Sequence, residues 1–287
     1  MNLTSFTSLN WAYQLHYYLC FRTHRCRNYL QDTSSLAQLL AEICGRHEYH
    51  LLDFEPYPDQ LRCLLSLQPG QNVSKVVQTI KSNASRELSI KLGLPKPVWG
   101  RGYLARSTGR MRIDAVREYL ASQSEHHGYA SRINPPVYHY RASEPRELKS
   151  AHASFDLSHH LVLATERRQG FFTSERGKSL CDYWLRVAEA RNFAIDQISV
   201  VPDHVHSLVR IVPSMSIEEC ALLLMNNGQH FMGKSYPEVF VKVGINQLWQ
   251  PSAYAGTCGE VTTALVKSWL NSTQERQDFN EPPTGIL

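Results

Sequence analysis

Hydrophobic and polar positions divide the chain into short segments, some alternating with a period of two and others repeating with a helical period. Residues 11–21 alternate strictly, with a large apolar side chain at every second position, and predict one half-buried strand. Similar strand patterns occupy 50–55, 60–67, 155–165 and 200–209, and a strand-like piece runs from 99 to 109. Helical spacing is found at 34–46, 74–92, 113–123, 174–191, 216–231 and 263–273. The order of these segments predicts a β-α-β-β-α-β-α unit that occurs twice.

Several residues recur in the second half at nearly the spacing that they have in the first. They are Pro58, Asp59, Trp99, Gly109 and Tyr119, which correspond to Pro202, Asp203, Trp249, Gly259 and Trp269. We therefore expect an α+β fold of two tandem ferredoxin-like domains, each an antiparallel sheet with helices packed on it. The expected parts are a first domain at 1–125, a linker at 126–152, a second domain at 153–275 and a flexible tail at 276–287.

Composition and charge limit the classes of protein to consider. The chain has 287 residues, 43% hydrophobic and 20% charged, as in globular proteins. It contains no apolar run of transmembrane length, and its first residues do not resemble a signal peptide. Seven cysteines without a Cys-x-x-Cys pair favour reduced thiols over a zinc ribbon. We expect a cytoplasmic protein without a membrane partner, and its net charge of +4 permits a polyanionic one.

The strand at 200–209 contains a His-Val-His motif. Side chains alternate along a strand, so His204 and His206 share one face and could bind one divalent cation. A pair of hydrogen-bonded strand histidines is the alternative. The matched positions in the first half are Gln60 and Arg62, and an arginine has no lone pair for a metal. The pairs His126-His127 and His159-His160 are assigned to a linker and to a strand edge.

The last helices of the two halves also differ, but here it is the first half that carries the candidate chemical residues. The first carries Tyr119 with Gln123 four residues later, which places both on one helical face. The second carries Trp269 and Thr273 at the matched positions, and tryptophan has no nucleophilic oxygen. Each half thus keeps the element that the other lacks. The alternative for Tyr119 is a packing tyrosine on an amphipathic helix.

These motifs resemble the single-tyrosine HUH transposases, the insertion-sequence and REP-associated type that acts on single-stranded DNA. The resemblance covers residues 8–125 and 153–275, and it rests on four motifs. They are VPDHVHSLV at 201–209, KSNASREL at 81–88, WGRGY at 99–103 and DAVREYL at 114–120. Family members dimerise with the histidines of one subunit facing the tyrosine helix of the other, so we expect a single-chain pseudo-dimer.

The resemblance implies a metal-dependent nicking and strand-transfer reaction. In the family the two histidines bind Mg²⁺ or Mn²⁺, a glutamine on the tyrosine helix can be the third ligand, and the tyrosine forms a 5′-phosphotyrosyl bond. For this chain that implies Tyr119 as nucleophile and His204, His206 and Gln123 as ligands in one composite site. The opposite site, with Gln60, Arg62, Trp269 and Thr273, would be inactive.

The expected partner is single-stranded DNA, with hairpin-forming ends as the recognised structure and nucleoid association when bound. A homodimer or partner proteins of a mobile element remain open. Basic residues are the candidate phosphate contacts: Arg22, Arg25, Arg27, Lys81, Arg86, Arg110, Arg112, Arg167 and Arg168. Two alternatives remain. One is a catalytically inactive domesticated transposase that binds or targets DNA hairpins. The other is an RNA-binding module, although the sequence lacks the aromatic signature of such modules.

Overall fold

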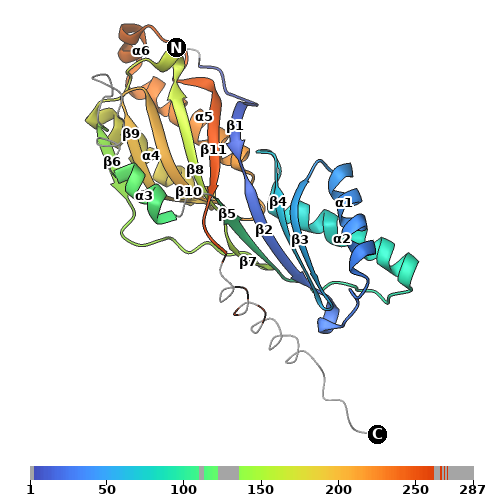
Figure 1. The fold of residues 1–287 in the computed structure, drawn as a ribbon. Coiled ribbons are helices and arrows are strands. Elements are labelled where there is room, and N and C mark those ends of the chain that lie inside the picture. Colours follow the sequence, from blue (N-terminus) through green and yellow to red (C-terminus); the bar gives the residue numbers. More distant parts are fainter. Residues whose placement is uncertain are drawn as a thin grey trace.

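The computed structural model describes residues 3–109, 113–121 and 136–261, with the single positions 266, 268 and 270. The side chains of residues 33 and 119–121 lie outside this description. The chain forms two β-sheets that lie next to each other, each with long helices packed on one face (Figure 1). This is the α+β arrangement of two ferredoxin-like halves that the repeat predicts.

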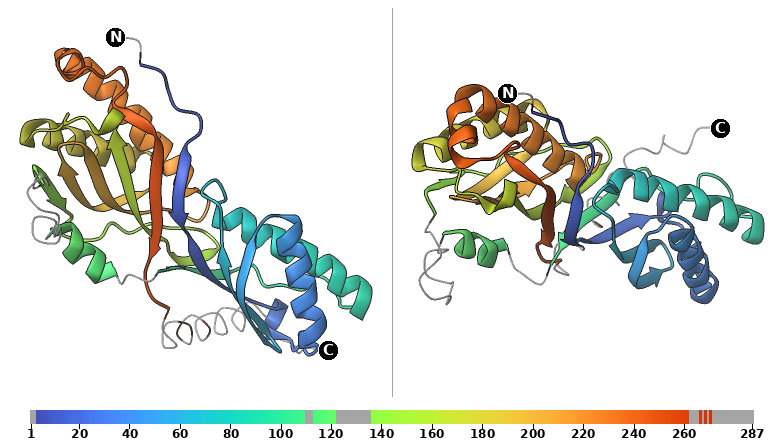
Figure 2. Two further views of the ribbon diagram at one scale, coloured as in Figure 1. Left: turned by 45° about the horizontal axis from the view of Figure 1, so that its top comes forward. Right: turned by 90° about the horizontal axis from the view of Figure 1, so that it is seen from above.

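The first sheet is built mostly from the first half of the chain. Its strands, in spatial order, are β3 (His50–Tyr57), β4 (Gln60–Ser66), β2 (His16–Arg22), β5 (Tyr103–Thr108) and β7 (Ala153–Asp156). Helices α1 (Thr33–Arg46) and α2 (Val73–Leu92) cover one face of it (Figure 2). The Asn72 side chain caps α2 at its start, and the left-handed Gly93 ends it.

The second sheet belongs mostly to the second half. Its strands, in spatial order, are β1 (Asn10–Gln14), β11 (Trp249–Cys258), β8 (Ser158–Thr165), β10 (His204–Arg210), β9 (Ala194–Val201) and β6 (Tyr138–Arg141). Helices α4 (Ser174–Ala190), α5 (Ile217–Ser235) and α6 (Pro237–Val243) belong to this half. The range 126–152, expected as a linker, therefore contains an edge strand, since β6 pairs with β9.

The alternating segment 11–21 is divided between the two sheets, which corrects the prediction of one strand. β1 pairs in parallel with β11 of the second sheet, whereas β2 pairs with β4 and β5 of the first. The second half repeats this exchange, because β7 joins β5 in parallel and β8 returns to the second sheet. Each half thus lends a short edge strand to the other. The alternation runs on through the break near Leu15, so the sequence pattern does not mark it.

The two halves meet at matched residues that bond to each other in pairs. Ser107 Oγ donates to the Cys258 carbonyl at 2.6 Å, and Thr257 Oγ1 donates to the Thr108 carbonyl at 2.5 Å. The Gly109 amide donates to the carbonyl of Gly259 at 3.2 Å. These reciprocal bonds indicate a pseudo-twofold relation between the halves.

Gly109 is packed too closely for any side chain, and this gives a testable prediction. A Cβ atom at Gly109 would lie 1.9 Å from the backbone oxygen of Thr257. Gly109→Ala is expected to lower the free energy of unfolding by about 1–3 kcal/mol, because the junction must move apart. The matched control is Gly45→Ala in α1, where nothing lies within 4 Å of the new methyl group. It should be neutral or stabilising by roughly 0.5–1 kcal/mol. Equal effects in urea denaturation would contradict the close junction.

Buried side chains of both halves form one continuous cluster. It includes Leu19 and Ile80 from the first half and Leu161 and Trp184 from the second. Tyr17 and His159 join the two sheets through a buried hydrogen bond of 2.8 Å. Of the helices that the structure describes, none is long and apolar enough to cross a membrane. The two halves therefore share a core rather than forming separate bodies on a linker.

Candidate functional site

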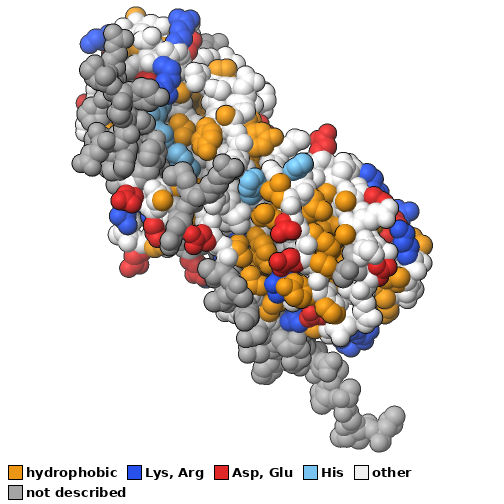
Figure 3. Space-filling view, viewed as in Figure 1, with side chains coloured by type: hydrophobic (Ala, Val, Ile, Leu, Met, Phe, Trp, Pro, Cys, Tyr) orange, Lys and Arg blue, Asp and Glu red, His pale blue; other side chains and the backbone are white. Residues whose placement is uncertain are grey.

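The His-Val-His motif lies on β10 with the side-chain alternation that the sequence predicts. Val205 is buried in the main core, which α4 and α5 cover. His204 and His206 face the other side of the sheet, where their ring centroids are 4.8 Å apart. Figure 3 shows histidine side chains in separate places on one face of the molecule, some of them beside hydrophobic side chains. The two imidazoles are therefore neighbours on the sheet face that these long helices leave free.

Each of the two imidazoles is held through its Nδ1 atom. His204 Nδ1 lies 2.7 Å from Asp203 Oδ1, and His206 Nδ1 lies 3.0 Å from His160 Nε2 on the neighbouring strand β8. Burial alone would raise the pKa of Asp203, but its bond to His204 and the nearby Arg168 lower that pKa below the usual value. Burial lowers the pKa of His160 to about 4. The Nδ1 atoms of both histidines are therefore engaged in hydrogen bonds.

Helix α3 (Ile113–Ala121) of the first half lies against this same face of the second sheet. Val116 is fully buried there against Leu208 and Cys258, and Leu208 shares a face with His206 on β10. Gln197 Nε2 on β9 donates to the Arg117 carbonyl at 3.1 Å. The helix that carries Tyr119 and the strand that carries the histidines thus meet on one surface, although they come from different halves (Figure 1).

The proposed nucleophile and third ligand are only partly visible in this arrangement. Tyr119 belongs to α3, one turn after Val116, but its side chain lies outside the described residues. Gln123 lies entirely outside them. In the part of the chain that the structure describes, no three His, Cys, Asp or Glu side chains are arranged to hold a metal ion. A cation held by His204 and His206 therefore needs a further ligand, and the roles of Tyr119 and Gln123 stay predictions.

The end of the second half makes the reciprocal exchange. Val266 packs with Cys20 and Leu104 on the first sheet, and the Leu270 carbonyl accepts a hydrogen bond of 3.2 Å from the Arg22 side chain. Trp269 and Thr273 lie outside the described residues. The last helical residues of each half therefore pack on the sheet of the other half. This exchange is the arrangement expected of a pseudo-dimer.

The matched site on the first sheet holds a guanidinium where the second sheet holds an imidazole. The Arg62 guanidinium lies 4.0 Å from the centroid of the Tyr57 ring and 3.6 Å from a carboxylate oxygen of Glu55. Gln60 accepts a weak hydrogen bond from the Cys20 thiol at 3.7 Å. A fixed cation at Arg62 opposes the approach of a metal ion. The inactivity of this matched site stays a prediction.

The candidate DNA contacts differ in how accessible they are. Arg110 and Arg112 lie outside the described residues, and Arg22 is paired with Asp59 on the first sheet. The exposed ones among those described are Arg25, Arg27, Arg86, Arg167 and Arg168. Arg25 and Arg167 occupy matched left-handed positions in two short turns, η1 (His24–Cys26) and η2 (Glu166–Arg168). Both halves therefore present arginine at an equivalent corner.

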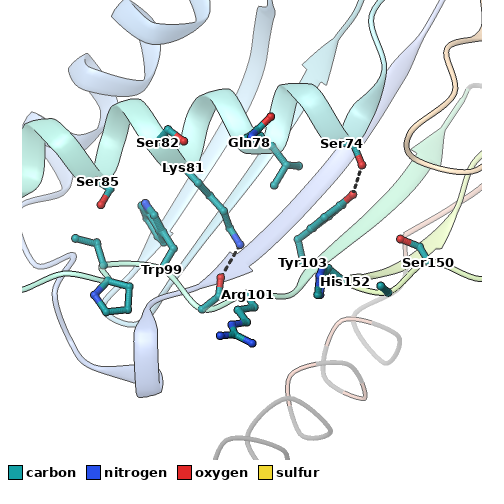
Figure 4. A pocket seen from close by; sticks show the side chains of 15 residues that line it. Ser74, Gln78, Lys81, Ser82, Ser85, Trp99, Arg101, Tyr103, Ser150 and His152 are labelled. Carbon is teal, nitrogen blue, oxygen red and sulfur yellow. Dashed lines mark hydrogen bonds between the residues drawn. The ribbon is translucent and has the colours of Figure 1, made fainter.

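Lys81 points inward, into a pocket of about 510 Å³ between α2 and the loop before β5 (Figure 4). Its Nζ donates to the carbonyls of Gly100 at 2.7 Å and Gly102 at 3.0 Å. Burial lowers the pKa of Lys81 to about 8. Ser74 and Tyr103 bond at 3.0 Å at the other end of this pocket. Lys81 thus holds the loop of the WGRGY motif, and its contact with DNA stays a prediction.

Sequence reasoning set His160 aside as part of a strand edge. The structure instead places His160 on the same face as His206, with the rings stacked 5.3 Å apart. Tyr254 of β11 contacts the His160 ring edge-on at 5.9 Å and is 40% exposed. Alternation along β8 places His159 and His160 on opposite faces of the sheet. Only the pairing of β8 with β10 shows which of the two shares a face with His206.

Comparison with known proteins adds an independent observation. The chain matches the family described as Transposase IS200 like over residues 11–123 and again over 153–273, together more than half of its length. The ISDra2 transposase TnpA of Deinococcus radiodurans is 25% identical over 134 residues, which are 46% of this chain and 96% of that protein. The transposase for insertion sequence element IS200 of Salmonella typhimurium is 22% identical over 135 residues, which are 47% of this chain and 88% of that protein.

Two solved structures show weaker likeness. A crystal structure of a Deinococcus radiodurans protein assigned as a transposase is 21% identical and covers 46% of this chain and 98% of its own, with a TM-score of 0.35. The structure of a REP-associated tyrosine transposase bound to a REP hairpin is 14% identical and covers 47% of this chain and 74% of its own, with a TM-score of 0.25. The curated relatives correspond to about half of this chain, and the family match occurs in both halves.

Proposed function

The chain belongs to the family of IS200-like transposases, and from that premise we propose that it nicks and rejoins single-stranded DNA at one composite site. The observation that supports this most is the packing of α3, from the first half, on the sheet face that carries His204 and His206. Tyr119 and Gln123 would come from the first half and the two histidines from the second. One such site per chain follows from the guanidinium of Arg62 at the matched place.

The proposed reaction is a transesterification at a DNA phosphate. The phenol oxygen of Tyr119 attacks the phosphorus, a Tyr–O–P bond forms, and the P–O3′ bond breaks. The phenol loses its proton to solvent, and the leaving 3′ oxygen gains one. A 5′-phosphotyrosyl bond and a free 3′-hydroxyl result. Because one ester replaces another, a 3′-hydroxyl can attack the intermediate in reverse, and strand joining needs no nucleotide hydrolysis.

The residues at the site fit a divalent cation, which would be Mg²⁺ or Mn²⁺. Such a cation, when bound, neutralises charge on the scissile phosphate and orients it for attack. His204 and His206 would hold it through Nε2, since Asp203 and His160 occupy their Nδ1 atoms. Imidazole ligands suit Mn²⁺ better than Mg²⁺, which prefers oxygen ligands. We therefore expect a higher rate of reaction with Mn²⁺ than with Mg²⁺.

We propose hairpin-forming single-stranded DNA as the substrate class. The exposed arginines of the two matched turns, Arg25 and Arg167, support this because they give each half a phosphate-directed corner. Arg86 on α2 adds a positive charge in the first half. The matched helix of the second half has no Lys or Arg in the corresponding segment, 225–230. Recognition should therefore be asymmetric and stronger on the first half.

A covalent adduct is the direct test of this function. Incubation with a labelled single-stranded oligonucleotide that contains a hairpin should give a protein–DNA band on a denaturing gel in the presence of Mn²⁺. Removal of the metal with a chelator should reduce this band at least about 100-fold, because charge neutralisation at the phosphate contributes several kcal/mol. Retained hairpin binding without any adduct or cleavage, under all metal conditions, would favour the inactive domesticated module instead.

A further inference from the structure

We propose that the pocket between α2 and the loop before β5 is a docking groove for an extended, acidic peptide segment of a partner protein. This inference goes beyond the proposed function, because the histidine face of the second sheet takes no part in it. It starts from a comparison within the chain. The matched groove of the second half is filled by the chain's own residues 3–9, whereas the groove of the first half is open.

Helices α2 and α5 can be matched residue by residue. Each begins directly after a capping side chain, which is Asn72 for α2 and Ser216 for α5. Counted from these caps, Asn83 and Asn227 occupy the same position, and each donates a side-chain bond of 2.8 Å to the carbonyl four residues earlier. The faces that the two helices present to their grooves are therefore equivalent in structure as well as in sequence.

In the second half, the segment 3–9 lies along α5 and is bound through its main chain. Asn226 Oδ1 accepts from the Phe6 amide at 2.7 Å, and Asn226 Nδ2 donates to the Phe6 carbonyl at 2.9 Å. Gln229 Nε2 donates to the Thr4 carbonyl at 2.8 Å. Bonds to main-chain atoms depend on the course of a peptide more than on its side chains. This face of the helix is thus suited to hold an extended segment.

In the first half, the matched positions line an open pocket of about 510 Å³ (Figure 4). Ser82 corresponds to Asn226 and Ser85 to Gln229, and both serines line the pocket. A serine hydroxyl can donate and accept, as the amide side chains of α5 do. The groove of the first half therefore keeps the polar positions that bind a main chain in the second.

The chain before β7 takes a different course from the chain before β1, and this leaves the groove open. Its last residues, 150–152, border the pocket, but no other described residue of this connection lines it. Arg146 instead bonds to the carbonyls of Ala188 and Phe193 in the second half, at 3.4 and 3.3 Å. The described chain thus provides no segment for this groove that corresponds to 3–9.

The charge of the lining indicates the chemistry of the occupant. Lys81 and the exposed Arg101 line the pocket, and none of its described lining residues is acidic. Lys81 replaces Met225 of α5, so this charge is special to the first half. Two N–H groups of Lys81 donate to the carbonyls of Gly100 and Gly102, and an ammonium group has a third. A peptide with Asp or Glu complements such a groove.

A library of random heptapeptides displayed on phage is the probe, selected on the full chain without DNA or metal. The enriched peptides should contain Asp and Glu in excess over the unselected library. Their binding, measured by fluorescence anisotropy with the synthetic peptide that is enriched most, should weaken as salt screens the charges. A selection that enriches no acidic peptide would overturn the inference.

Substitutions in the groove test where the peptide binds. Ser82→Trp should lower its affinity at least about 10-fold, because the indole ring fills the groove. Ala41→Trp is the matched control and should bind as the wild type does, since both positions are exposed on the two helices of the first sheet. Arg101→Met should lower the affinity roughly 2- to 5-fold, as expected for an exposed ion pair. Equal affinity of Ser82→Trp and the wild type would overturn the inference.

Hydrogen–deuterium exchange of the wild-type chain gives a readout that needs no variant. Bound peptide should slow exchange at 98–102 and 150–152, which border the pocket, and protection confined to other segments would overturn the inference. Displacement of the peptide by a hairpin oligonucleotide, with hairpin binding lost in Ser82→Trp but kept in Ala41→Trp, would assign the groove to nucleic acid instead. These measurements involve no cleavage, so failure of the proposed function would leave their outcome unchanged.

Discussion

Tyr119→Phe is expected to abolish the covalent DNA adduct and to lower single-strand cleavage by roughly 10³-fold or more, because it removes only the proposed nucleophilic oxygen. The aromatic ring stays, so the packing of α3 on the second sheet through Val116 should be unaffected. Hairpin binding by the variant, measured by gel shift, should therefore match that of the wild type. The measurement of activity is the fraction of labelled DNA that migrates with the protein on a denaturing gel.

The matched control for this variant is Tyr13→Phe. Tyr13 lies on β1 and is 45% exposed, and the register of β1 with β11 places it on the opposite face of the sheet from Tyr254. The Tyr13→Phe substitution removes a phenol oxygen from the second sheet and leaves the face that carries the histidines unchanged. Adduct formation by Tyr119→Phe at the wild-type level would remove Tyr119 from the mechanism. The packing interpretation of this tyrosine would then hold.

His206→Ala should lower metal-dependent cleavage at least about 100-fold, since it removes one of two imidazoles from the proposed cation site. The first half offers a matched change, Arg62→Ala, at the position that corresponds to His206 in the repeat. This control should cleave at the wild-type rate with saturating DNA, because its site has no ligand set for a metal. An equal loss in Arg62→Ala would contradict the assignment of a single active site.

Mixing the two inactive variants distinguishes a site within one chain from a site between chains. Val116 of α3 packs on Leu208 of its own chain, so the proposed site would take Tyr119 and His206 from one molecule. A mixture of Tyr119→Phe and His206→Ala should therefore stay as inactive as either variant alone. Recovery of cleavage on mixing would show that α3 exchanges between chains, and the single-chain composite site would be wrong.

Much of the architecture could be predicted from local patterns. The helix expected at 74–92 is observed as α2 at Val73–Leu92, and the helix at 174–191 as α4 at Ser174–Ala190. Apolar spacing and capping residues act within a few turns, so the sequence carries this information directly. The prediction of one strand at 11–21 was wrong in one respect, since this segment forms two strands in two sheets. Alternation reports which face a residue occupies, but not which sheet its strand joins.

The candidate site was predicted in the same uneven way. The His-Val-His spacing placed His204 and His206 on one face, and the repeat showed that Gln60 and Arg62 replace them in the first half. The hydrogen bond of His160 to His206 was missed, because it depends on the pairing of β8 with β10, and those residues are far apart in the sequence. The contact of Tyr254 with His160 was missed for the same reason, because it depends on the pairing of β11 with β8. The bond of Asp203 to its sequence neighbour His204 was not predicted either.

The sequence by itself determined the duplication, the candidate residues for the chemistry and the alternation that puts both histidines on one face. These properties follow from spacing and residue type, which are local. Only the tertiary structure decided that α3 of the first half packs on the second sheet, and that the last helical residues of the second half pack on the first. This packing depends on contacts between residues far apart in the sequence. They include the bond between Gly109 and Gly259 and the burial of Val116 and Val266 against the opposite sheets.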